Sequence, residues 1–359
     1  MGLFKILDSP IYNNRKIKFC MKKYVGFSIM LFFISCSNGE NRELNEKFPR
    51  MIRLKAEKIE IKEIIKPGLI LLLDNYLIVQ NEYNHSEDCF FVYSLEPFKF
   101  LYSFGRLGQG PDEYIAHRLI QNSNGNVLSV FDQSSRYIHN FHITDTEPVL
   151  IEKNRIEDNR REPFQELSYL NDSIILLLKY DYTLCSYNIN EKIFLDEFNF
   201  ETDIKKKLGE NYKLSLETYH FSNYKDKIVI GHNYINTLSA GKIENNKFII
   251  NNKKLTSSGV NQSLYKNSLY YLYTTTTSEH IFAQYYGLPF IQLQPFPINM
   301  KKRNFNFYIE VYDWNLNPLV LLEFDSDILR CAIDEKNKTI YTWNPLEDFD
   351  YLLVYKYDI

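Results

Sequence analysis

The feature that most constrains the fold of this chain is a repeated unit of short strands and polar turns. In each unit a polar turn precedes an apolar strand, and a second turn leads to a strand rich in aromatic residues. Six such turns can be aligned, at Asp74-Asn75, Asn124-Gly125-Asn126, Asn171-Asp172, Lys225-Asp226-Lys227, Lys266-Asn267 and Lys336-Asn337-Lys338. Their mean spacing is about 52 residues, which with about four short strands per unit is typical of β-propeller blades.

Composition also favours strands over helices. The chain contains 28 Tyr and 26 Phe, residue types enriched in strands, and no stretch after Cys36 shows sustained helical periodicity with caps. The 324 residues from Cys36 to Ile359 suffice for two ordinary domains or one large propeller. Together with the repeat, this predicts an all-β fold, a six-bladed β-propeller with four-stranded antiparallel blades.

The ring of such a propeller has to be closed, because an open edge strand invites aggregation. The segment Ile52–Ile61 precedes the first full unit and has no partner of its own. We expect it to pair with the last unit, which contains Thr339–Trp343 and Tyr351–Tyr357. The Pro-rich stretch between Gly287 and Asn304 is predicted to be a long loop.

The N-terminal segment has the features of a bacterial lipoprotein signal. Lys22 and Lys23 precede an apolar run, Tyr24–Ile34, which ends at Ser35 and Cys36. This order matches a basic region, an apolar core and a small residue before a lipidated cysteine. The alternatives are an ordinary cleaved signal peptide, or an apolar segment with a chance cysteine.

These features predict a domain organisation of three parts. Residues 1–35 form the signal peptide, with the true start at Met21, and residues 36–50 form a flexible polar tether. Residues 51–359 form the propeller. Acyl chains on Cys36 are expected to attach the mature protein to a membrane of the cell envelope, and we predict the outer membrane. The sequence does not distinguish its periplasmic side from its surface side.

Charge and cysteine usage exclude several classes of function. The chain has a net charge of −3, and removal of residues 1–35, which carry +5, leaves −8. An acidic propeller is unsuited to binding nucleic acid, because the phosphates are bound by a basic protein surface. Cys89, Cys185 and Cys331 lie far apart in apolar contexts without a CxxC pair. We expect them to be small buried residues, with one disulfide as the alternative and no metal or other cofactor.

A glycine-rich motif resembles a known family. Phe104 is followed by the sequence Gly-Arg-Leu-Gly-Gln-Gly-Pro-Asp-Glu-Tyr at 105–114. It resembles the Gly-x-x-Gly-x-Gly-Pro-x-Glu-aromatic signature of six-bladed propeller lipoproteins from Bacteroidetes, which are grouped with TolB-like and NHL-like propellers. Tyr271–Gly287, Ile309–Leu319 and residues 332–341 also resemble that family. The resemblance implies a fold and an envelope location, and it supplies no catalytic residues.

The motif has a structural and a functional interpretation. In the structural one, Gly105, Gly108, Gly110 and Pro111 build a crossover loop between the first two blades, with the glycines permitting positive φ and close backbone approach. In the functional one, four polar residues of this region face a central channel and bind a ligand; they are Arg106, Asp112, Glu113 and His117.

Two classes of function remain open at this stage, with a purely structural role as a third possibility. The seven histidines are scattered, and no Gly-x-Ser-x-Gly or His-Glu-x-x-His motif is present. We therefore favour a non-catalytic, lipid-anchored propeller that binds a protein, peptide or glycan partner, such as an outer-membrane complex, at its channel face. The alternative is an envelope hydrolase or lyase acting on polysaccharide or peptide. A cluster of ionisable groups in the channel would favour the enzyme, and an apolar or aromatic channel would favour binding.

Overall fold

The computed structural model describes most of the chain after the tether. The described residues are 48–64, 66–82, 88–110, 113–120, 122, 127–158, 163–181, 183–199, 219–255, 268–289, 306–345, 347 and 350–359. All lie in the unit Glu40–Ile359. The signal segment and Cys36 lie outside the described residues, as do residues 290–305 of the expected long loop.

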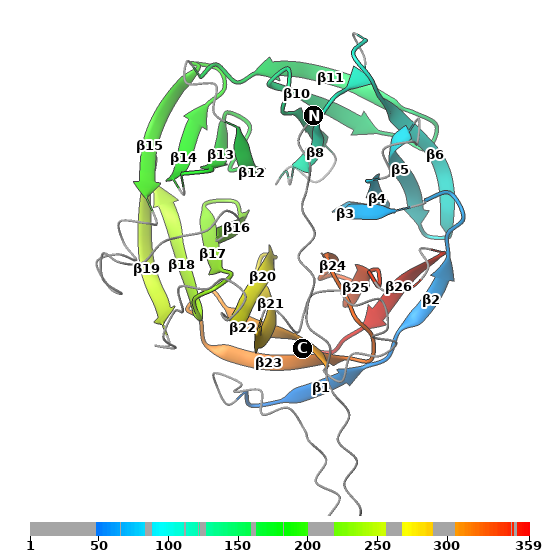
Figure 1. Cartoon of the computed structure of the whole chain (residues 1–359), viewed down its shortest axis with the longest axis vertical. Helices are drawn as coiled ribbons and strands as arrows, with labels where there is room; N and C mark the ends of the chain where they lie inside the picture. Colours follow the sequence, from blue (N-terminus) through cyan, green and yellow to red (C-terminus); the bar gives the residue numbers. More distant parts are fainter. Residues whose placement is uncertain are drawn as a thin grey trace, which may run out of the picture. The chain divides into compact units, whose positions relative to one another are not determined.

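Six β-sheets form a ring around a central axis, which confirms the six-bladed propeller (Figure 1). The first blade has β3 (Pro67–Leu73), β4 (Tyr76–Asn81), β5 (Asp88–Leu95), β6 (Phe98–Leu107) and the short β7 (Glu113–Tyr114). The second has β8 (His117–Ile120), β9 (Val127–Asp132), β10 (Tyr137–Ile143) and β11 (Pro148–Arg155). The third has β12 (Phe164–Tyr169), β13 (Ile174–Lys179), β14 (Thr183–Asn188) and β15 (Ile193–Asn199).

The other three blades follow the same order. The fourth has β16 (Tyr219–Tyr224), β17 (Lys227–His232), β18 (Thr237–Glu244) and β19 (Lys247–Leu255). The fifth has β20 (Ser268–Thr276), β21 (His280–Pro289), β22 (Phe307–Asp313) and β23 (Pro318–Phe324). The sixth has β24 (Cys331–Asp334), β25 (Thr339–Thr342) and β26 (Tyr351–Lys356). In each blade the first of these strands lies nearest the axis (Figure 1).

The true repeat is more regular than the aligned turns suggest. The second strands of the blades begin at residues 76, 127, 174, 227, 280 and 339, so the spacing runs from 47 to 59 residues. Five of the six aligned turns precede these second strands. Lys266-Asn267 instead precedes β20, the first strand of its blade, and the equivalent turn is Thr277–Glu279. The alignment therefore slipped in the fifth blade, which created the uneven spacings there.

The N-terminal segment closes the ring, as predicted, but it serves two blades. Strand β2 (Glu57–Glu60) pairs antiparallel with β26 and completes the sixth blade. Strand β1 (Met51–Leu54) pairs in parallel with β23, so the fifth blade gains an outer strand. The indole of Trp343 also donates a hydrogen bond to the Gly68 carbonyl (3.1 Å), joining the last blade to the first.

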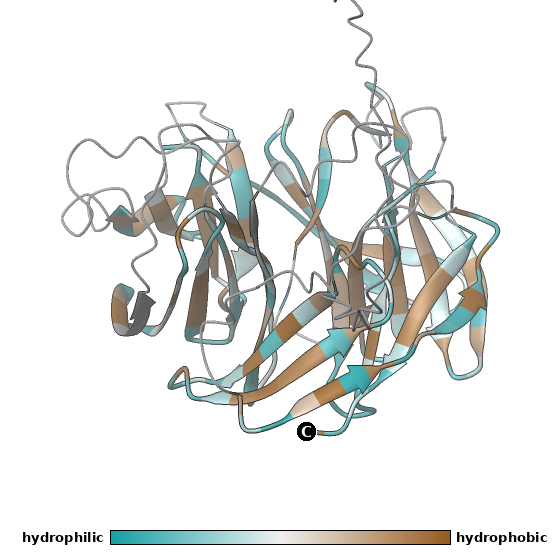
Figure 2. Ribbon diagram, turned by 60° about the horizontal axis from the view of Figure 1, so that its bottom comes forward, coloured by the Kyte–Doolittle hydropathy of each residue, from teal (hydrophilic) through white to brown (hydrophobic). Residues whose placement is uncertain are grey.

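The core consists of six apolar clusters, each between two neighbouring blades. Alternation along the strands explains this arrangement, because successive side chains point to opposite faces of a sheet. On β13, Ile175 and Leu177 pack toward the second blade, whereas Leu176 and Leu178 pack toward the fourth. Apolar residues accordingly recur along the strands of the blades (Figure 2). Among the described residues, no helix is long and apolar enough to cross a membrane.

The three cysteines of the propeller are free thiols. Cys89 and Cys185 are buried in the blades, as expected from their apolar contexts. Cys331 is only half-buried, because it begins β24 at the inner surface of the ring. The disulfide considered as an alternative is therefore not formed between these residues.

Candidate functional site

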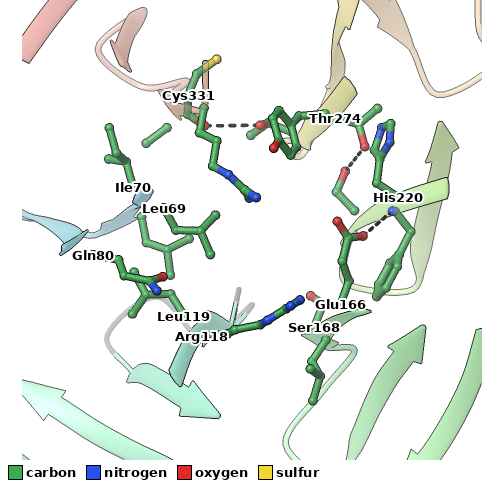
Figure 3. Close-up of a pocket in the computed structure, with 18 of the residues that line it drawn as sticks. Leu69, Ile70, Gln80, Arg118, Leu119, Glu166, Ser168, His220, Thr274 and Cys331 are labelled. Carbon is green, nitrogen blue, oxygen red and sulfur yellow. Dashed lines mark hydrogen bonds between the residues drawn. The ribbon is translucent and has the colours of Figure 1, made fainter. Parts of the chain in front are cut away.

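The first strands of all six blades surround a cavity of about 580 Å³ on the propeller axis (Figure 3). Its wall is apolar along β3, where Leu69 and Ile70 contribute, and polar over much of the remainder. The polar side chains come from every blade; they include Gln80, Glu82, His117, Arg118, Gln165, Glu166, His220, Ser222, Tyr273, Thr274 and Arg330. Such a concave, mixed surface is the usual character of a ligand site.

Two arginines reach this cavity from different blades. Arg118 on β8 donates a hydrogen bond to the backbone carbonyl of Gln165, which orients its guanidinium group. Arg330, directly before β24, stacks on Tyr273 with its Cζ 4.1 Å from the ring centroid. Within the part of the chain that the structure describes, neither guanidinium forms a salt bridge with a carboxylate. The cavity therefore carries positive charge that no direct ion pair neutralises.

Glu166 on β12 is a carboxyl group that shares the cavity with this charge. Its Oε2 accepts a hydrogen bond from the Phe221 backbone amide (2.8 Å), and Figure 3 shows Glu166 and Arg118 extending into the same space. Burial raises the pKa of Glu166 to about 7, against the lowering effects of the Phe221 hydrogen bond, Arg330 and Arg118. Both protonation states of this carboxyl are thus accessible near neutral pH.

Two histidines on the cavity wall are neutral at physiological pH. Burial lowers the pKa of His117 to about 4, with Asp132 opposing, and that of His220 also to about 4. Hydrogen bonding to Asn233 opposes the shift of His220, whose Nδ1 lies 3.2 Å from Asn233 Oδ1. A neutral imidazole offers one donor and one acceptor.

Several buried polar atoms on the wall have no hydrogen-bond partner among the described residues. They are both side-chain atoms of the Gln165 amide, Gln80 Oε1, His220 Nε2 and both ring nitrogens of His117. Gln165 is 6% exposed and His220 is 4% exposed. Buried polar groups are almost always hydrogen-bonded, so these atoms are exceptions, and all of them belong to residues that line the cavity.

The residues singled out in the sequence lie mostly elsewhere. Of the four expected to bind a ligand, Asp112 lies outside the described residues, and of the other three only His117 lines the cavity. Arg106 is exposed on β6, the fourth strand of its blade. Glu113 accepts a hydrogen bond from the Gly110 amide (2.7 Å) and so braces its own loop. The expectation that Arg106 and Glu113 face the channel is therefore wrong.

The glycine motif leads from the end of the first blade to the second, through the parallel pair β6 and β7. Gly105 has the predicted positive φ, at 75°. Gly108 and Gly110 do not, so the prediction of positive φ is wrong for these two. Close approach is what they permit, because a Cβ on Gly108 would lie 1.9 Å from Glu113 Oε2 and one on Gly110 3.0 Å from it. Pro111 lies outside the described residues.

The polar cavity residues that sequence reasoning missed share a position in the repeat. Arg118, Glu166, His220, Tyr273 and Arg330 each lie seven to nine residues before the second strand of their blade. A correct alignment of all six units would have placed polar residues at this position on a common inner surface. The misaligned turn in the fifth blade hides this shared position when the six units are compared.

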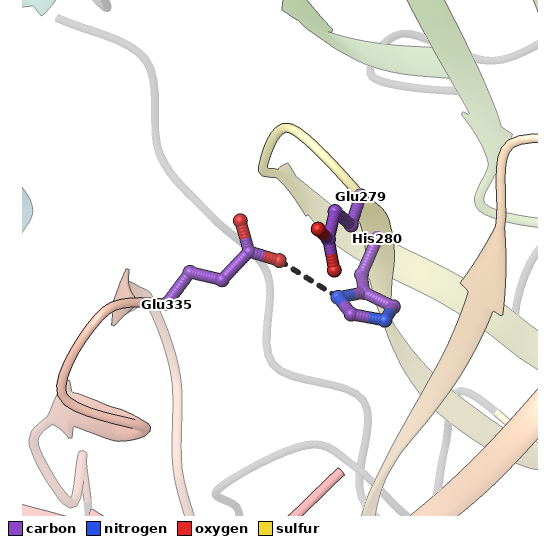
Figure 4. Close-up of side chains that lie close together, drawn as sticks. All are labelled: Glu279, His280 and Glu335. Carbon is purple, nitrogen blue, oxygen red and sulfur yellow. Dashed lines mark hydrogen bonds and ion pairs between the residues drawn. The ribbon is translucent and has the colours of Figure 1, made fainter.

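A second cluster lies where the β20–β21 turn meets the β24–β25 turn (Figure 4). The ligand atoms of Glu279, His280 and Glu335 lie within 4.8 Å of one another, and these residue types bind transition metals. Glu335, however, is already engaged: His280 Nδ1 lies 2.7 Å from its Oε1, and the Thr277 and Ser278 hydroxyls donate at 2.7 and 2.9 Å. The contacts join the fifth and sixth blades.

No family model matches the chain, and the search of curated proteins finds no significant sequence relative. Solved structures show a similar fold. A member of the DUF4221 family from Bacteroides vulgatus has a TM-score of 0.52 at 13% identity, over 84% of this chain and 98% of that chain. A putative exported protein from Bacteroides fragilis has a TM-score of 0.52 at 14% identity, over 85% and 95%. At this identity the likeness is one of fold alone.

Proposed function

We propose that this protein is a lipid-anchored propeller of the cell envelope that binds a small polar ligand, a glycan or peptide group, in its central cavity. We group it with the TolB-like and NHL-like propeller lipoproteins of Bacteroidetes because of the glycine motif at 105–114. The envelope location rests on the signal that ends at Cys36. The similar fold of a putative exported Bacteroides protein agrees with it.

The observation that carries the binding function is the set of unpaired polar atoms on the cavity wall. Gln165 is more than nine-tenths buried, yet neither polar atom of its amide has a partner among the described residues. Leaving such atoms unsatisfied costs about 1–3 kcal/mol each. A propeller selected only for rigidity would gain by replacing them with apolar residues, so a polar occupant of the cavity is the simplest reason for them.

A hydrolase or lyase is the second candidate, supported by a specific observation. Ionisable groups do converge in the cavity, where Arg118, Glu166, His220 and Arg330 come from four blades. A carboxyl group whose pKa is raised to about 7 can act as a general acid or base. We place binding first because one carboxyl group of raised pKa does not by itself define a reaction.

The binding function can be tested by filling the cavity. Leu69→Trp adds bulk from the apolar β3 wall, and Leu150→Trp on the exposed outer strand β11 is the matched control. The full-length lipidated proteins would be equilibrated in detergent with an envelope extract, washed, and analysed by native mass spectrometry. We expect wild type and Leu150→Trp to retain a small molecule that Leu69→Trp loses. Equal retention by all three would contradict cavity binding, and a ligand released with an altered mass would favour the enzyme.

The anchor has its own test. Cys36→Ala should abolish labelling by a radioactive fatty acid and move the protein from the membrane fraction to the soluble fraction. Asn38→Ala, in the tether just after the lipidation site, is the control, since it leaves Cys36 intact. Membrane retention of Cys36→Ala with unchanged labelling would contradict the lipoprotein assignment.

A further inference from the structure

We infer that the cavity holds the carboxylate group of its ligand between Arg118 and Arg330. This inference rests on the proposed binding function and deepens it, because it names the chemical group that is recognised. It follows from three features: how the guanidinium groups are held, the charge balance around them, and the polar groups nearby.

Both guanidinium groups are fixed in place with donors to spare. A guanidinium has five N–H donors, and in Arg118 a hydrogen bond to the Gln165 carbonyl uses part of this set. Arg330 lies over the ring of Tyr273, with its Cζ 4.1 Å from the ring centroid. Preorganised arginines of this kind are suited to planar oxyanions, which they bind through charge-assisted hydrogen bonds.

The charge balance favours a single negative charge. Two positively charged guanidinium groups share the cavity with the carboxyl group of Glu166. Glu82 also lines the wall, but its charge is balanced by Lys66 (3.5 Å). Both arginines act electrostatically on Glu166, so all three groups lie within mutual influence. The histidines on the wall, His117 and His220, add no charge at neutral pH. One added carboxylate would neutralise the excess, whereas a phosphate dianion would be repelled by Glu166 when that group is ionised.

The neighbouring polar groups indicate what accompanies the carboxylate. The Gln165 amide has an unpaired donor and an unpaired acceptor, and Gln80 Oε1 is a further unpaired acceptor on the wall. The Ser222 and Thr274 hydroxyls, bonded to each other at 3.1 Å, lie on the same wall. Mixed donors and acceptors suit hydroxyl or amide groups beside the acid. A sugar acid and an N-acylated amino acid are the two sources of this chemistry.

The test compares acids with their neutral counterparts by isothermal titration calorimetry on the full-length protein in detergent. The probes are galacturonic acid and its methyl ester, N-acetylalanine and its methyl amide, and inorganic phosphate. We expect one of the two acids to bind at least tenfold more tightly than its neutral counterpart and than phosphate. Which acid does so identifies the source of the carboxylate.

Variants then assign the preference to the two arginines. Arg118→Gln and Arg330→Gln should each remove the preference for the acid, and Arg106→Gln, an exposed arginine outside the cavity, should leave it unchanged. Thermal melts establish that each variant is folded. Equal binding of acid and neutral probes, tighter binding of phosphate, or no binding of either acid would overturn the inference. If a neutral probe binds and Leu69→Trp abolishes that binding, cavity binding stands and only the carboxylate assignment fails.

Discussion

Gly231 on β17 lies directly opposite His220 on β16, and a Cβ atom on Gly231 would lie 2.2 Å from His220 Nε2. Non-bonded atoms do not approach that closely, so the His220 imidazole occupies the space that a side chain on residue 231 would need. The position of a cavity histidine thus depends on a glycine in the second strand of the blade. Asn233, bonded to His220 Nδ1, holds the other side of the ring.

Gly231→Ala should therefore displace the His220 ring and destabilise the fold. Overpacking of this kind costs about 1–3 kcal/mol, to be measured by urea denaturation. The double variant Gly231→Ala/His220→Ala should be less destabilised than the sum of the single changes, because removal of the ring removes the clash. Additive losses would show that the two residues do not compete for one space.

Stability should fall on mild acidification because of the buried histidines. The pKa of His117 and of His220 is lowered to about 4 in the folded state, from an ordinary value of 6.5, and that of His232 is also lowered. Between pH 4 and 6.5 these histidines bind more protons in the unfolded chain than in the folded one. The free energy of unfolding therefore decreases as pH falls from 6.5 toward 4. For His117 and His220 the loss is about 3 kcal/mol each once the pH has fallen below 4.

The measurement is the free energy of unfolding as a function of pH. His220→Gln should reduce the slope between pH 6.5 and 4, whatever its effect on stability at pH 8. His142→Gln, at an exposed position on the second blade, is the matched control and should leave the slope unchanged. A slope unaffected by His220→Gln would mean that this histidine is not held neutral.

Strand periodicity explains why the fold could be predicted from the sequence. Successive side chains of a strand point to opposite faces, and in a blade both faces are buried against neighbouring blades. On β13 the residues at 174–178 are therefore all apolar, and the neighbours Leu176 and Leu177 pack toward opposite blades. The unpaired segment at 52–61 likewise predicted ring closure. Its division between β23 and β26 could not be foreseen, because it depends on how two blades meet.

The cavity could not be predicted in the same way. Arg118, Glu166 and Arg330 are more than forty residues apart in the sequence and form no motif. They meet only because the ring brings the first strands of the blades together. The glycine motif does not reflect a ligand site. Its glycines at 108 and 110 are needed because the Glu113 carboxyl packs closely against them within one loop.

Glu335 should act as a clamp between the fifth and sixth blades. It accepts hydrogen bonds from Thr277, Ser278 and His280. Glu335→Gln weakens charge-assisted bonds and should lower the free energy of unfolding by about 1–2 kcal/mol at pH 7. Glu279→Gln, an exposed change on the same hairpin, should have little effect.

The clamp should also have a signature in acid. Burial raises the pKa of Glu335, but the hydrogen bonds from Thr277, His280 and Ser278 outweigh it, and the net pKa lies below 4.5. A carboxyl group with a lowered pKa stabilises the fold above its unfolded pKa, and that contribution is lost as pH falls through the folded value. Wild type and Glu335→Gln should therefore converge in stability below pH 4.5. A constant difference down to pH 3 would contradict this role.

The two kinds of glycine in the motif should respond differently to alanine. Gly105 has a φ of 75°, and a Cβ there would lie 2.9 Å from Phe90 Cδ2, in a buried aromatic cluster. Gly105→Ala thus combines backbone strain with overpacking and should cost about 2 kcal/mol or more. At Gly110 the backbone is unstrained and the nearest atoms belong to the Glu113 carboxyl, which can shift. Gly110→Ala should cost less than about 1 kcal/mol. Urea denaturation of both variants gives the comparison, and equal losses would show that positive φ at Gly105 carries no special cost.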